Sequence, residues 1–546
     1  KKDPTATMSE PVEPIVYYVD SGAPEPIRSA LVEGASWWNQ AFEAAGYKNA
    51  FQVKILPEDA DPMDVRYNVI TWVHRSTRGW SYGQGVVDPR TGEIIKGHVN
   101  LGSLRVRQDY LIAEGLLAPY EEGKPVSPEM LKMALARLRQ LAAHEVGHTL
   151  GLRHNFAASV FNRASVMDYP HPLIRINKDG TLDLSQAYDT GIGEWDKVAI
   201  AYGYQDFPDR YDHDNALEDI LQKAFKRGLI FISDQDARPA GGAHPLAHLW
   251  DNGTSAVDEL QHILAVREIA LQRFGENNIR PGQPLATLEE VLVPVYLMHR
   301  YQTEAAAKVL GGLFYTYAVR GDGQKITEVV DADEQRRALQ VLLKTLSPAT
   351  LALPEKILQL IPPRPPGYPR SRETFNSRTG VTFDPLAAVE SAANHTLQLL
   401  LHPQRATRLV EFHARNPRYP GLSEVLDRII EATWKQRPPS PYHAEIQRVV
   451  NNLVLYHLMN LATTESTATQ VRALAYTKLD ELKGWLENQI KNEKDDAQRA
   501  HYVFAVAQIQ QFQADPKKFQ LTSPLTLPAG APIGSLTDWD CGFQIY

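Results

Sequence analysis

The sequence predicts an α/β domain at the N-terminus followed by a mainly α-helical region at the C-terminus. Three observations support this fold class. Strand-like and helix-like segments alternate over residues 1–205, whereas residues 206–546 contain mainly segments with the apolar spacing of helices. The chain has 546 residues, which is too long for one ordinary hydrophobic core, so we expect two or three domains.

The N-terminal part contains clusters of β-branched and aromatic residues that are typical of strands. We expect strands at residues 14–20, 51–56 and 68–74, and a hairpin over residues 81–103. The turn of this hairpin is predicted at Asp88-Pro89-Arg90-Thr91-Gly92, because proline and glycine favour tight turns. A helix is predicted from Pro26 to about Ala45.

The C-terminal part contains windows in which apolar residues recur at helical spacing. They are residues 256–274, 285–310, 331–346, 385–401, 422–434, 442–461, 468–491 and 497–515. No fixed repeat period is present, which argues against a solenoid. The proline-rich stretch at residues 361–380 predicts a linker or an extended loop.

Composition and charge exclude several classes of protein. Hydrophobic residues make up 43% and charged residues 22% of the chain, the balance of a soluble globular protein. The formal net charge of −8 argues against a nucleic-acid partner, and no apolar run approaches the roughly 18 residues of a transmembrane segment. The start, KKDPTATMSEP, has no signal-peptide core and no initiator methionine, so we expect a longer precursor. The single cysteine, Cys541, excludes an intrachain disulfide and a cysteine-based zinc site.

A long helix is predicted to end in the stretch HEVGHTLGLRHN, residues 144–155. Ser127 followed by Pro128 and Glu129 is typical of a helix N-terminus. Leu131, Leu135, Leu138 and Ala142 then recur at helical spacing up to the first histidine. The helix would bury this apolar stripe and carry the histidines on another face.

The histidines of this stretch have the spacing of a catalytic zinc site. On a helix, His144 and His148 lie one turn apart on the same face, so their imidazoles can bind one ion. Gly151 can end the helix in a left-handed turn, which brings His154 back as a third ligand. Three neutral imidazoles leave the fourth position of zinc for water, and Glu145 can act as the general base. By chance, such a five-residue pattern arises on the order of 10⁻⁴ times in a chain of this length.

These residues resemble the extended zinc signature of the metzincin metalloproteases. The segment Ser165-Val166-Met167-Asp168-Tyr169-Pro170 resembles their Met-turn, in which Met167 would form an apolar floor beneath the histidines. The segment GEWDKVAIAYG, residues 193–203, resembles their closing helix. The resemblance implies a metzincin-like catalytic domain over residues 12–205, with a mixed five-stranded sheet and an active-site helix.

A narrower resemblance covers most of the chain. The segments SEPVEPIVYYVD, WWNQAFEAAGYKNA and DPRTGEI, with the large helical part, resemble a bacterial family of large zinc-dependent metalloproteases. We therefore expect a secreted, periplasmic or envelope-associated protein. The expected organisation is an N-terminal tail at residues 1–11, the catalytic domain at 12–205, a helical region at 206–360, the proline-rich segment at 361–380 and a helical C-terminal region at 381–546.

The expected activity is that of a zinc-dependent endopeptidase with one catalytic Zn²⁺ and a peptide or protein substrate. The first hairpin strand would be the edge strand that pairs with substrate backbone. Its candidate residues are Gly83, Gln84, Gly85 and Val86. In astacins and serralysins, a tyrosine at the Met-turn position of Tyr169 binds zinc and can swing away to hydrogen-bond the oxyanion. The alternative for Tyr169 is simple packing beneath the site.

Other interpretations remain open at the level of sequence. One is a zinc amidase or deacylase that acts on cell-wall or small-molecule amides. Another is a binding or scaffold protein with a vestigial zinc site, although the glutamate counts against it. Asp234 and Asp236 could bind Ca²⁺, although further ligands of a recognised calcium loop are missing. Cys541 could bind zinc as a latency thiol, but an idle thiol is the simpler interpretation. The oligomeric state is not specified.

Overall fold

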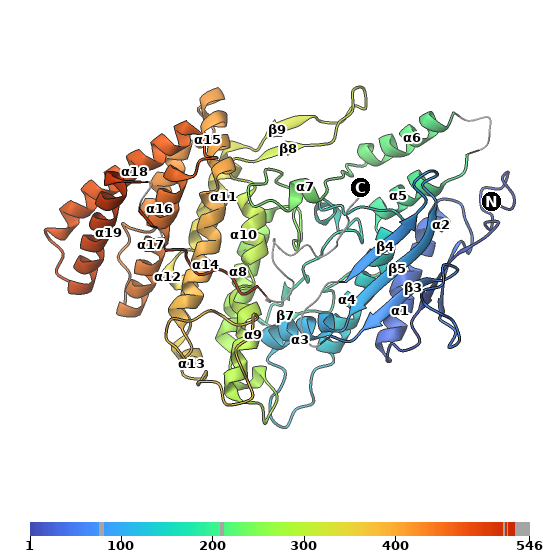
Figure 1. Ribbon diagram of the computed structural model, residues 1–546, viewed down its shortest axis with the longest axis horizontal. Helices are drawn as coiled ribbons and strands as arrows, with labels where there is room; N and C mark the ends of the chain where they lie inside the picture. Colours follow the sequence, from blue (N-terminus) through green and yellow to red (C-terminus); the bar gives the residue numbers. More distant parts are fainter. Residues whose placement is uncertain (76–80, 208–211, 517–518, 521, 530–546) are drawn as a thin grey trace.

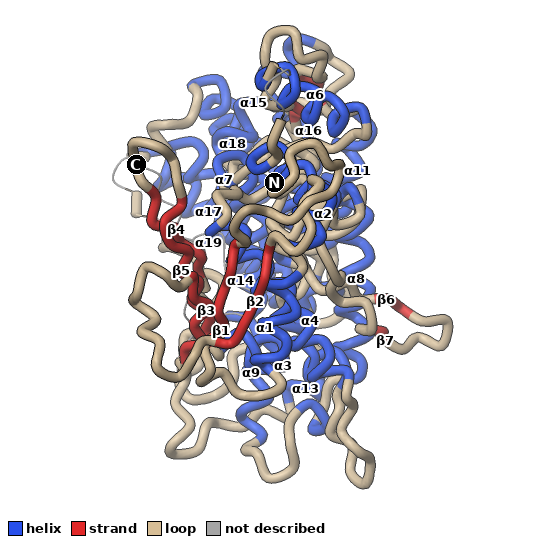
Figure 2. Tube along the Cα trace, turned by 90° about the vertical axis from the view of Figure 1, so that its right-hand side faces the viewer, coloured by secondary structure: helices blue, strands red, loops and turns tan. Residues whose placement is uncertain are grey.

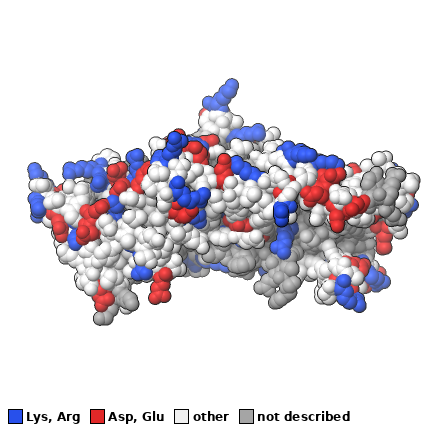
Figure 3. All heavy atoms as spheres, turned by 90° about the horizontal axis from the view of Figure 1, so that it is seen from above, with Lys and Arg blue, Asp and Glu red and all other residues white. Residues whose placement is uncertain are grey.

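A sheet-containing domain lies at one end of the molecule and an array of helices at the other (Figure 1). The computed structural model describes residues 1–75, 81–207, 212–516, 519–520 and 522–529. Cys541 lies outside these residues. On the face shown in Figure 3, basic and acidic side chains are interspersed, and no extended area of one sign is visible among the coloured atoms.

The sheet has five strands in the order β2-β1-β3-β5-β4, which confirms the predicted mixed five-stranded sheet. The strands are β1 (Ile15–Val19), β2 (Phe51–Ile55), β3 (Asn68–Val73), β4 (Tyr82–Val87) and β5 (Ile94–Gly102). The pairs β1–β2, β1–β3 and β3–β5 are parallel, and only β4 pairs antiparallel with its neighbour. Figure 2 shows the strands side by side, with β4 at one edge.

Five helices complete the sheet domain. They are α1 (Ile27–Ser36), α2 (Trp38–Ala44), α3 (Leu104–Leu117), α4 (Glu129–Thr149) and α5 (Glu194–Tyr204). The single helix predicted from Pro26 to Ala45 is wrong in one respect, because it divides at Trp37 into α1 and α2. The helix α3 was not predicted. The core between the sheet and α4 contains fully buried Val19, Ile70 and Val146.

The rest of the chain is mainly helical, as predicted. Its longer helices are α6 (His213–Lys226), α8 (Ala256–Arg273), α9 (Leu288–Tyr296), α10 (Arg300–Ala307), α11 (Ala332–Lys344), α14 (Pro385–Leu400), α15 (Pro403–Arg415), α16 (Leu422–Ala432), α17 (Pro441–Thr463), α18 (Thr469–Ile490) and α19 (Asp496–Ala514). Its short elements are α7 (Asp234–Ala237), α12 (Pro348–Leu351), α13 (Glu355–Leu358) and the hairpin of β8 (Leu313–Tyr315) and β9 (Thr327–Val329). A two-stranded ribbon of β6 (Arg175–Ile176) and β7 (Leu182–Asp183) precedes α5.

Two departures from the predicted helices have physical reasons. The window 285–310 is interrupted around Leu297 and contains Pro294, so α9 and α10 form in place of one long helix. The helix α15 was missed because its charged sequence buries only three apolar side chains. These are Ala406, Leu409 and Phe412.

A second hydrophobic core joins the two ends of the molecule. It includes Met133 of α4, Phe156 and Tyr169 from the sheet domain, together with Leu292 of α9 and Trp434 after α16. The proline-rich segment contributes Ile361 and Phe375 to the same core, so it is an extended loop that packs on the helices. Within the described part of the chain, no helix is long and apolar enough to cross a membrane.

Candidate metal centre

The end of α4 turns the chain back towards its own last turn. The N–H of Gly151 donates to the carbonyl of His148, and the N–H of Leu152 donates to that of Gly147, both at 3.0 Å. These two bonds form a Schellman motif, which requires the left-handed conformation that Gly151 adopts at φ 89°. The turn brings His154 beside His148, as the sequence predicts.

The Nε2 atoms of three histidines converge on one point. The Nε2 atom of His148 lies 3.2 Å from that of His144 and 3.1 Å from that of His154. On the opposite side of each ring, Nδ1 lies within hydrogen-bond distance of an oxygen. The acceptors are the carbonyl of Val166 for His144 at 2.7 Å, that of Leu152 for His148 at 2.9 Å, and the carboxylate of Asp234 for His154 at 2.9 Å.

This arrangement fits a cation. A neutral imidazole carries one N–H, and the Nδ1 acceptors place it on Nδ1, so three Nε2 lone pairs face one another. Such lone pairs repel unless a positive ion lies between them. A tetrahedral zinc ion lies about 2.0–2.1 Å from each nitrogen, which places neighbouring nitrogens roughly 3.3–3.4 Å apart. The observed separations of 3.1 and 3.2 Å are close to this value.

The protonation of the histidines suits metal binding. All three side chains are buried, with exposed fractions of 1–2%. Burial lowers the pKa of each imidazole, and it lowers the pKa of His148 to about 3. The rings are therefore neutral at neutral pH, the state in which histidine binds metals.

A carboxylate from α7 orients the third histidine. Asp234 accepts hydrogen bonds from Nδ1 of His154 at 2.9 Å and from Nε of Arg238 at 2.6 Å. Burial acts to raise the pKa of Asp234, but these two donors outweigh it and hold the pKa below its ordinary range. A charged carboxylate on the second ring nitrogen fixes the tautomer of the ligand and raises its basicity.

The Met-turn packs against α4 between the first two histidines. Met167 is 1% exposed. A Cβ atom at Gly147 would lie 2.3 Å from the sulfur of Met167 and 2.7 Å from the ring of Trp38. Only glycine at this position therefore allows the Met-turn to approach the helix so closely.

The closing helix α5 fixes the Met-turn. The buried carboxylate of Asp196 accepts hydrogen bonds from the hydroxyl of Ser165 at 2.6 Å and from the N–H groups of Val166 and Gly193 at 2.8 Å. Since the carbonyl of Val166 is the acceptor for His144, Asp196 helps to position this ligand through the backbone of the Met-turn.

The two predicted catalytic side chains lie beside the triad. Glu145 follows the first ligand on α4 and is 1% exposed. The ring centroid of Tyr169 lies 5.3 Å from that of His144 and 4.9 Å from that of His154. The hydroxyl of Tyr169 accepts a hydrogen bond from Arg238 at 3.2 Å, so the arginine that binds Asp234 also positions this tyrosine.

The predicted edge strand lies directly over the active-site helix. The strand β4 is at the edge of the sheet and runs antiparallel to β5, and its residues Gly83, Gln84, Gly85 and Val86 pair with residues 96–99. A Cβ atom at Gly83 would lie 1.9 Å from the carbonyl oxygen of Glu145 and 3.2 Å from Cβ of His148. The backbone of β4 is thus at van der Waals distance from the metal-binding turns.

Residues 230–252 enclose the third ligand from outside the predicted catalytic domain. The N–H of Phe156 donates to the carbonyl of Ile232 at 2.8 Å, and the N–H of His248 donates to that of Phe156 at 3.1 Å. The N–H of Trp250 donates to the carbonyl of Tyr169 at 2.8 Å. The surroundings of the metal centre therefore extend beyond residue 205.

The structure does not support the calcium site. Asp234 binds His154 and Arg238, and the carboxylate of Asp236 accepts hydrogen bonds from the hydroxyls of Tyr315 and Tyr317. Among the described residues, the three histidines form the one group of potential metal ligands that converge within 4.8 Å. The role of Asp234 was missed because its only local signal was the Asp-x-x-x-Arg spacing to Arg238, which is common on helix surfaces.

Comparison with known proteins shows a match to one protein family. A family model described as Met-zincin matches residues 127–440, which is more than half of the chain. The match includes all three histidines, the Met-turn and α7. No curated protein and no solved structure matches the chain significantly.

Proposed function

Because the chain belongs to the Met-zincin family and carries the three-histidine site of a zinc metalloprotease, we propose that it is an endopeptidase with Glu145 as its general base. The observation that carries this proposal is the convergence of three Nε2 atoms, each fixed by an acceptor on Nδ1. Three protein ligands leave a position for a reacting molecule, which is the pattern of catalytic zinc sites.

In this proposal, zinc and Glu145 have different roles in peptide hydrolysis. Zinc in such a site supplies Lewis acidity, which polarises a carbonyl oxygen and acidifies water. The carboxylate of Glu145, one residue from the first ligand, accepts the proton of the attacking water and delivers it to the leaving amine. The position of Glu145 on α4, directly after the first ligand, supports this role, because a general base must lie within hydrogen-bond reach of the proton that it accepts.

Tyr169 is suited to stabilise negative charge on the substrate oxygen. Its ring lies against His144 and His154, and Arg238 holds its hydroxyl oxygen. The same hydroxyl carries a proton of its own, so it can also donate a hydrogen bond to a substrate oxygen. A donor held in place before the reaction stabilises an oxyanion without reorganisation during the step.

The edge strand β4 offers a way to hold an extended polypeptide. Residues 83–86 form the edge of the sheet, and Gly83 lies next to α4 at the level of Glu145. A substrate strand that pairs with this edge satisfies its amide groups through the backbone, whatever its side chains. This mode favours unfolded or extended protein segments over small amides.

The proposal is tested with Glu145→Gln. We expect this variant to bind zinc as the wild type does, to melt at the same temperature, and to cleave a diverse peptide library about 10²–10⁴-fold more slowly. Zinc content is measured by mass spectrometry of the metal and cleavage by mass spectrometry of the peptides. The variant His148→Ala, which removes a ligand, provides the zinc-free control.

Two results would contradict the proposal. Near-normal cleavage by Glu145→Gln would exclude the glutamate as the base. Hydrolysis of N-acyl amino acids or cell-wall amides by zinc-loaded wild type, without cleavage of any library peptide, would assign the site to an amidase instead.

A further inference from the structure

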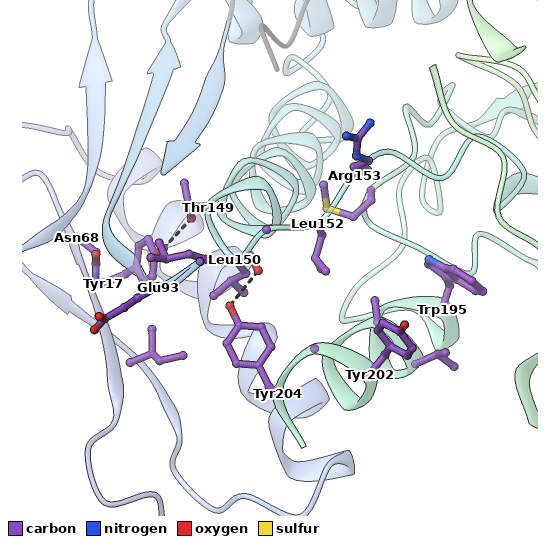
Figure 4. A pocket seen from close by; sticks show the side chains of 18 of the residues that line it. Tyr17, Asn68, Glu93, Thr149, Leu150, Leu152, Arg153, Trp195, Tyr202 and Tyr204 are labelled. Atoms are coloured by element: carbon purple, nitrogen blue, oxygen red, sulfur yellow. Dashed lines mark hydrogen bonds between the residues drawn. The ribbon is translucent and has the colours of Figure 1, made fainter. Parts of the chain in front are cut away.

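A large cavity opens beside the turn that follows α4 (Figure 4). Its volume is about 1100 Å³. Its walls come from β1, the start of β5, residues 149–153, the helices α5 and α6, and the hairpin of β8 and β9. Pockets that hold small molecules or peptide side chains typically measure roughly 300–1,000 Å³, so this one is large enough for several residues of a polypeptide.

The walls of the cavity are mainly aromatic and aliphatic. Trp195 of α5 stacks on Phe231 with ring centroids 5.6 Å apart, and both side chains are only half-buried. Phe225 of α6 is half-buried, and Tyr202 of α5 is 46% exposed. Figure 4 shows Trp195 and Tyr202 on α5, and Tyr204 reaching the carbonyl of Leu150. Apolar rings that remain accessible in a concave site favour an apolar ligand.

The charged residues of the cavity do not favour a charged ligand. Glu13 and Glu93 lie at the wall together with Arg66 and Arg153. Since two acidic and two basic side chains balance, the charge of the wall favours neither an anionic nor a cationic ligand.

The cavity shares a wall with the metal centre but is separate from it. Leu152 lines the cavity, and its carbonyl is the acceptor for Nδ1 of His148. Met167, which packs against α4 at Gly147, also lines it. The three histidines and Glu145 do not. A ligand in the cavity would therefore lie close to the metal centre without touching the metal.

The direction of β4 determines which end of a bound substrate extends towards the cavity. Gly83 marks the level of the metal centre, because its Cβ position touches both Glu145 and His148. From there β4 runs to Val87 and into the turn whose residues Gly92–Ile95 line the cavity. A substrate strand antiparallel to β4 runs the opposite way, so its residues upstream of the scissile bond extend towards this turn.

Distance indicates which upstream residues reach the cavity. Each residue of an extended strand spans about 3.3 Å, and Val87 lies four positions after Gly83. A substrate residue about four positions upstream of the scissile bond would then lie beside Val87. Val86 and Val87 are 56% and 48% exposed, which continues the apolar surface from the edge strand to the cavity.

We propose that this cavity is a recognition site for the substrate itself, and that it binds aromatic or aliphatic side chains about four or more residues upstream of the scissile bond. This inference rests on the proposed endopeptidase function. It makes the enzyme selective for apolar stretches of extended polypeptide, although the edge strand β4 binds only the backbone of the substrate.

The test uses a pair of peptides derived from any sequence that the library digestion shows to be cleaved. The two peptides are identical around the scissile bond and differ at positions four to six upstream, which carry Phe and Leu in one and Ser and Asn in the other. Burial of one or two such side chains predicts that wild type prefers the apolar peptide by about tenfold or more in kcat/KM.

The variant Tyr202→Ala/Phe225→Ala should abolish this preference and leave cleavage of the polar peptide unchanged. The matched control is Tyr368→Ala/Phe504→Ala, which removes an exposed tyrosine and an exposed phenylalanine elsewhere, 42% and 60% exposed. The control should retain the full preference. An equal preference in wild type and in the cavity variant would overturn the proposal.

A binding measurement separates this inference from the proposed function and does not depend on cleavage. A fluorescein-labelled hexapeptide with the upstream Phe and Leu residues is titrated with zinc-loaded Glu145→Gln, and anisotropy is recorded. We expect binding at least about tenfold tighter than that of the Ser and Asn hexapeptide. The single variant Tyr202→Ala, made in the Glu145→Gln protein, should weaken binding of the apolar hexapeptide. Because the side chain of Tyr202 is 46% exposed, its removal should leave the fold intact. Equal binding of both hexapeptides would overturn the recognition site even if the enzyme cleaves peptides.

Discussion

Two of the ligand histidines are held by backbone carbonyls and the third by a carboxylate. His144 and His148 donate to backbone carbonyls within the same domain, whereas His154 donates to the carboxylate of Asp234. A carbonyl orients a ring, but a carboxylate also increases the electron density of the ring on the metal side. His154 therefore depends on a charged residue that lies 80 positions away in the sequence.

Replacement of Asp234 should weaken the binding of zinc. We expect Asp234→Asn to lower zinc affinity by about 10–100-fold while the protein stays folded, because asparagine can accept the same hydrogen bond without the charge. Affinity is measured by competition with a chelating dye. Asp236→Asn serves as the control, since Asp236 binds Tyr315 and Tyr317 and not a ligand. Equal affinities in the two variants would disprove the orienting role.

Removal of one hydroxyl tests the role of Tyr169. If its O–H donates to the developing oxyanion, Tyr169→Phe should lower kcat by about tenfold or more and leave KM nearly unchanged. The matched control is Tyr296→Phe, which removes a buried hydroxyl bonded to the carbonyl of Leu351 in the helical region. Steady-state kinetics on one peptide decides between the roles, because an unchanged kcat would leave Tyr169 as a packing residue.

At the scale of elements, the Met-turn packs closely against α4 at Gly147. The variant Gly147→Ala should destabilise the protein by about 1–3 kcal/mol, because the new methyl group overlaps Met167 and Trp38. The matched control is Gly484→Ala in α18, where nothing lies within 4 Å of the Cβ position. That change should stabilise the protein by up to about 1 kcal/mol through helix propensity. Thermal melting measures both, and stabilisation by Gly147→Ala would contradict the close contact.

The sequence predicts those helices, strands and turns that are determined by residues close together in the chain. The strands of the sheet, α4 and its glycine-ended turn follow from spacing and turn chemistry within about twenty residues. The contact of α7 with His154 does not, because no local pattern indicates which distant carboxylate meets a given histidine. For the same reason, the sequence indicates for Asp234 only a possible role in binding calcium. The break of the first helix at Trp37 was hidden by apolar residues that continue on both sides of it.

At the scale of the whole molecule, buried histidines make stability depend on pH. They are His171, with a pKa lowered to about 3, and His244, His248, His457 and His501, each with a pKa lowered to about 4. Burial is the main cause in every case. Between about pH 4 and 6.5 the unfolded chain binds more protons than the folded one, so their stabilising effect is present above pH 6.5 and is lost on acidification.

We therefore expect the free energy of unfolding to fall as the pH is lowered from 7 to 5. His457→Gln removes one such group and preserves a donor for Asn394, its hydrogen-bond partner at 2.7 Å. This variant should reduce the slope of unfolding free energy against pH by up to about 1.4 kcal/mol per pH unit. Urea unfolding at several pH values measures the slope, and identical slopes in both proteins would show that His457 does not titrate on unfolding.

The tight packing of Met167 also gives the site resistance to oxidation. Peroxide converts methionine to its sulfoxide at a rate that follows access to the sulfur, and a polar sulfoxide in this tightly packed position would disrupt the contact with α4. Of the seven methionines, Met8 and Met63 are 49% and 75% exposed, whereas the other five are exposed by at most 3%. The two accessible sulfurs lie outside the metal centre and should react first, so an oxidant reacts at these positions before it reaches the thioether of Met167, which packs against α4 at Gly147.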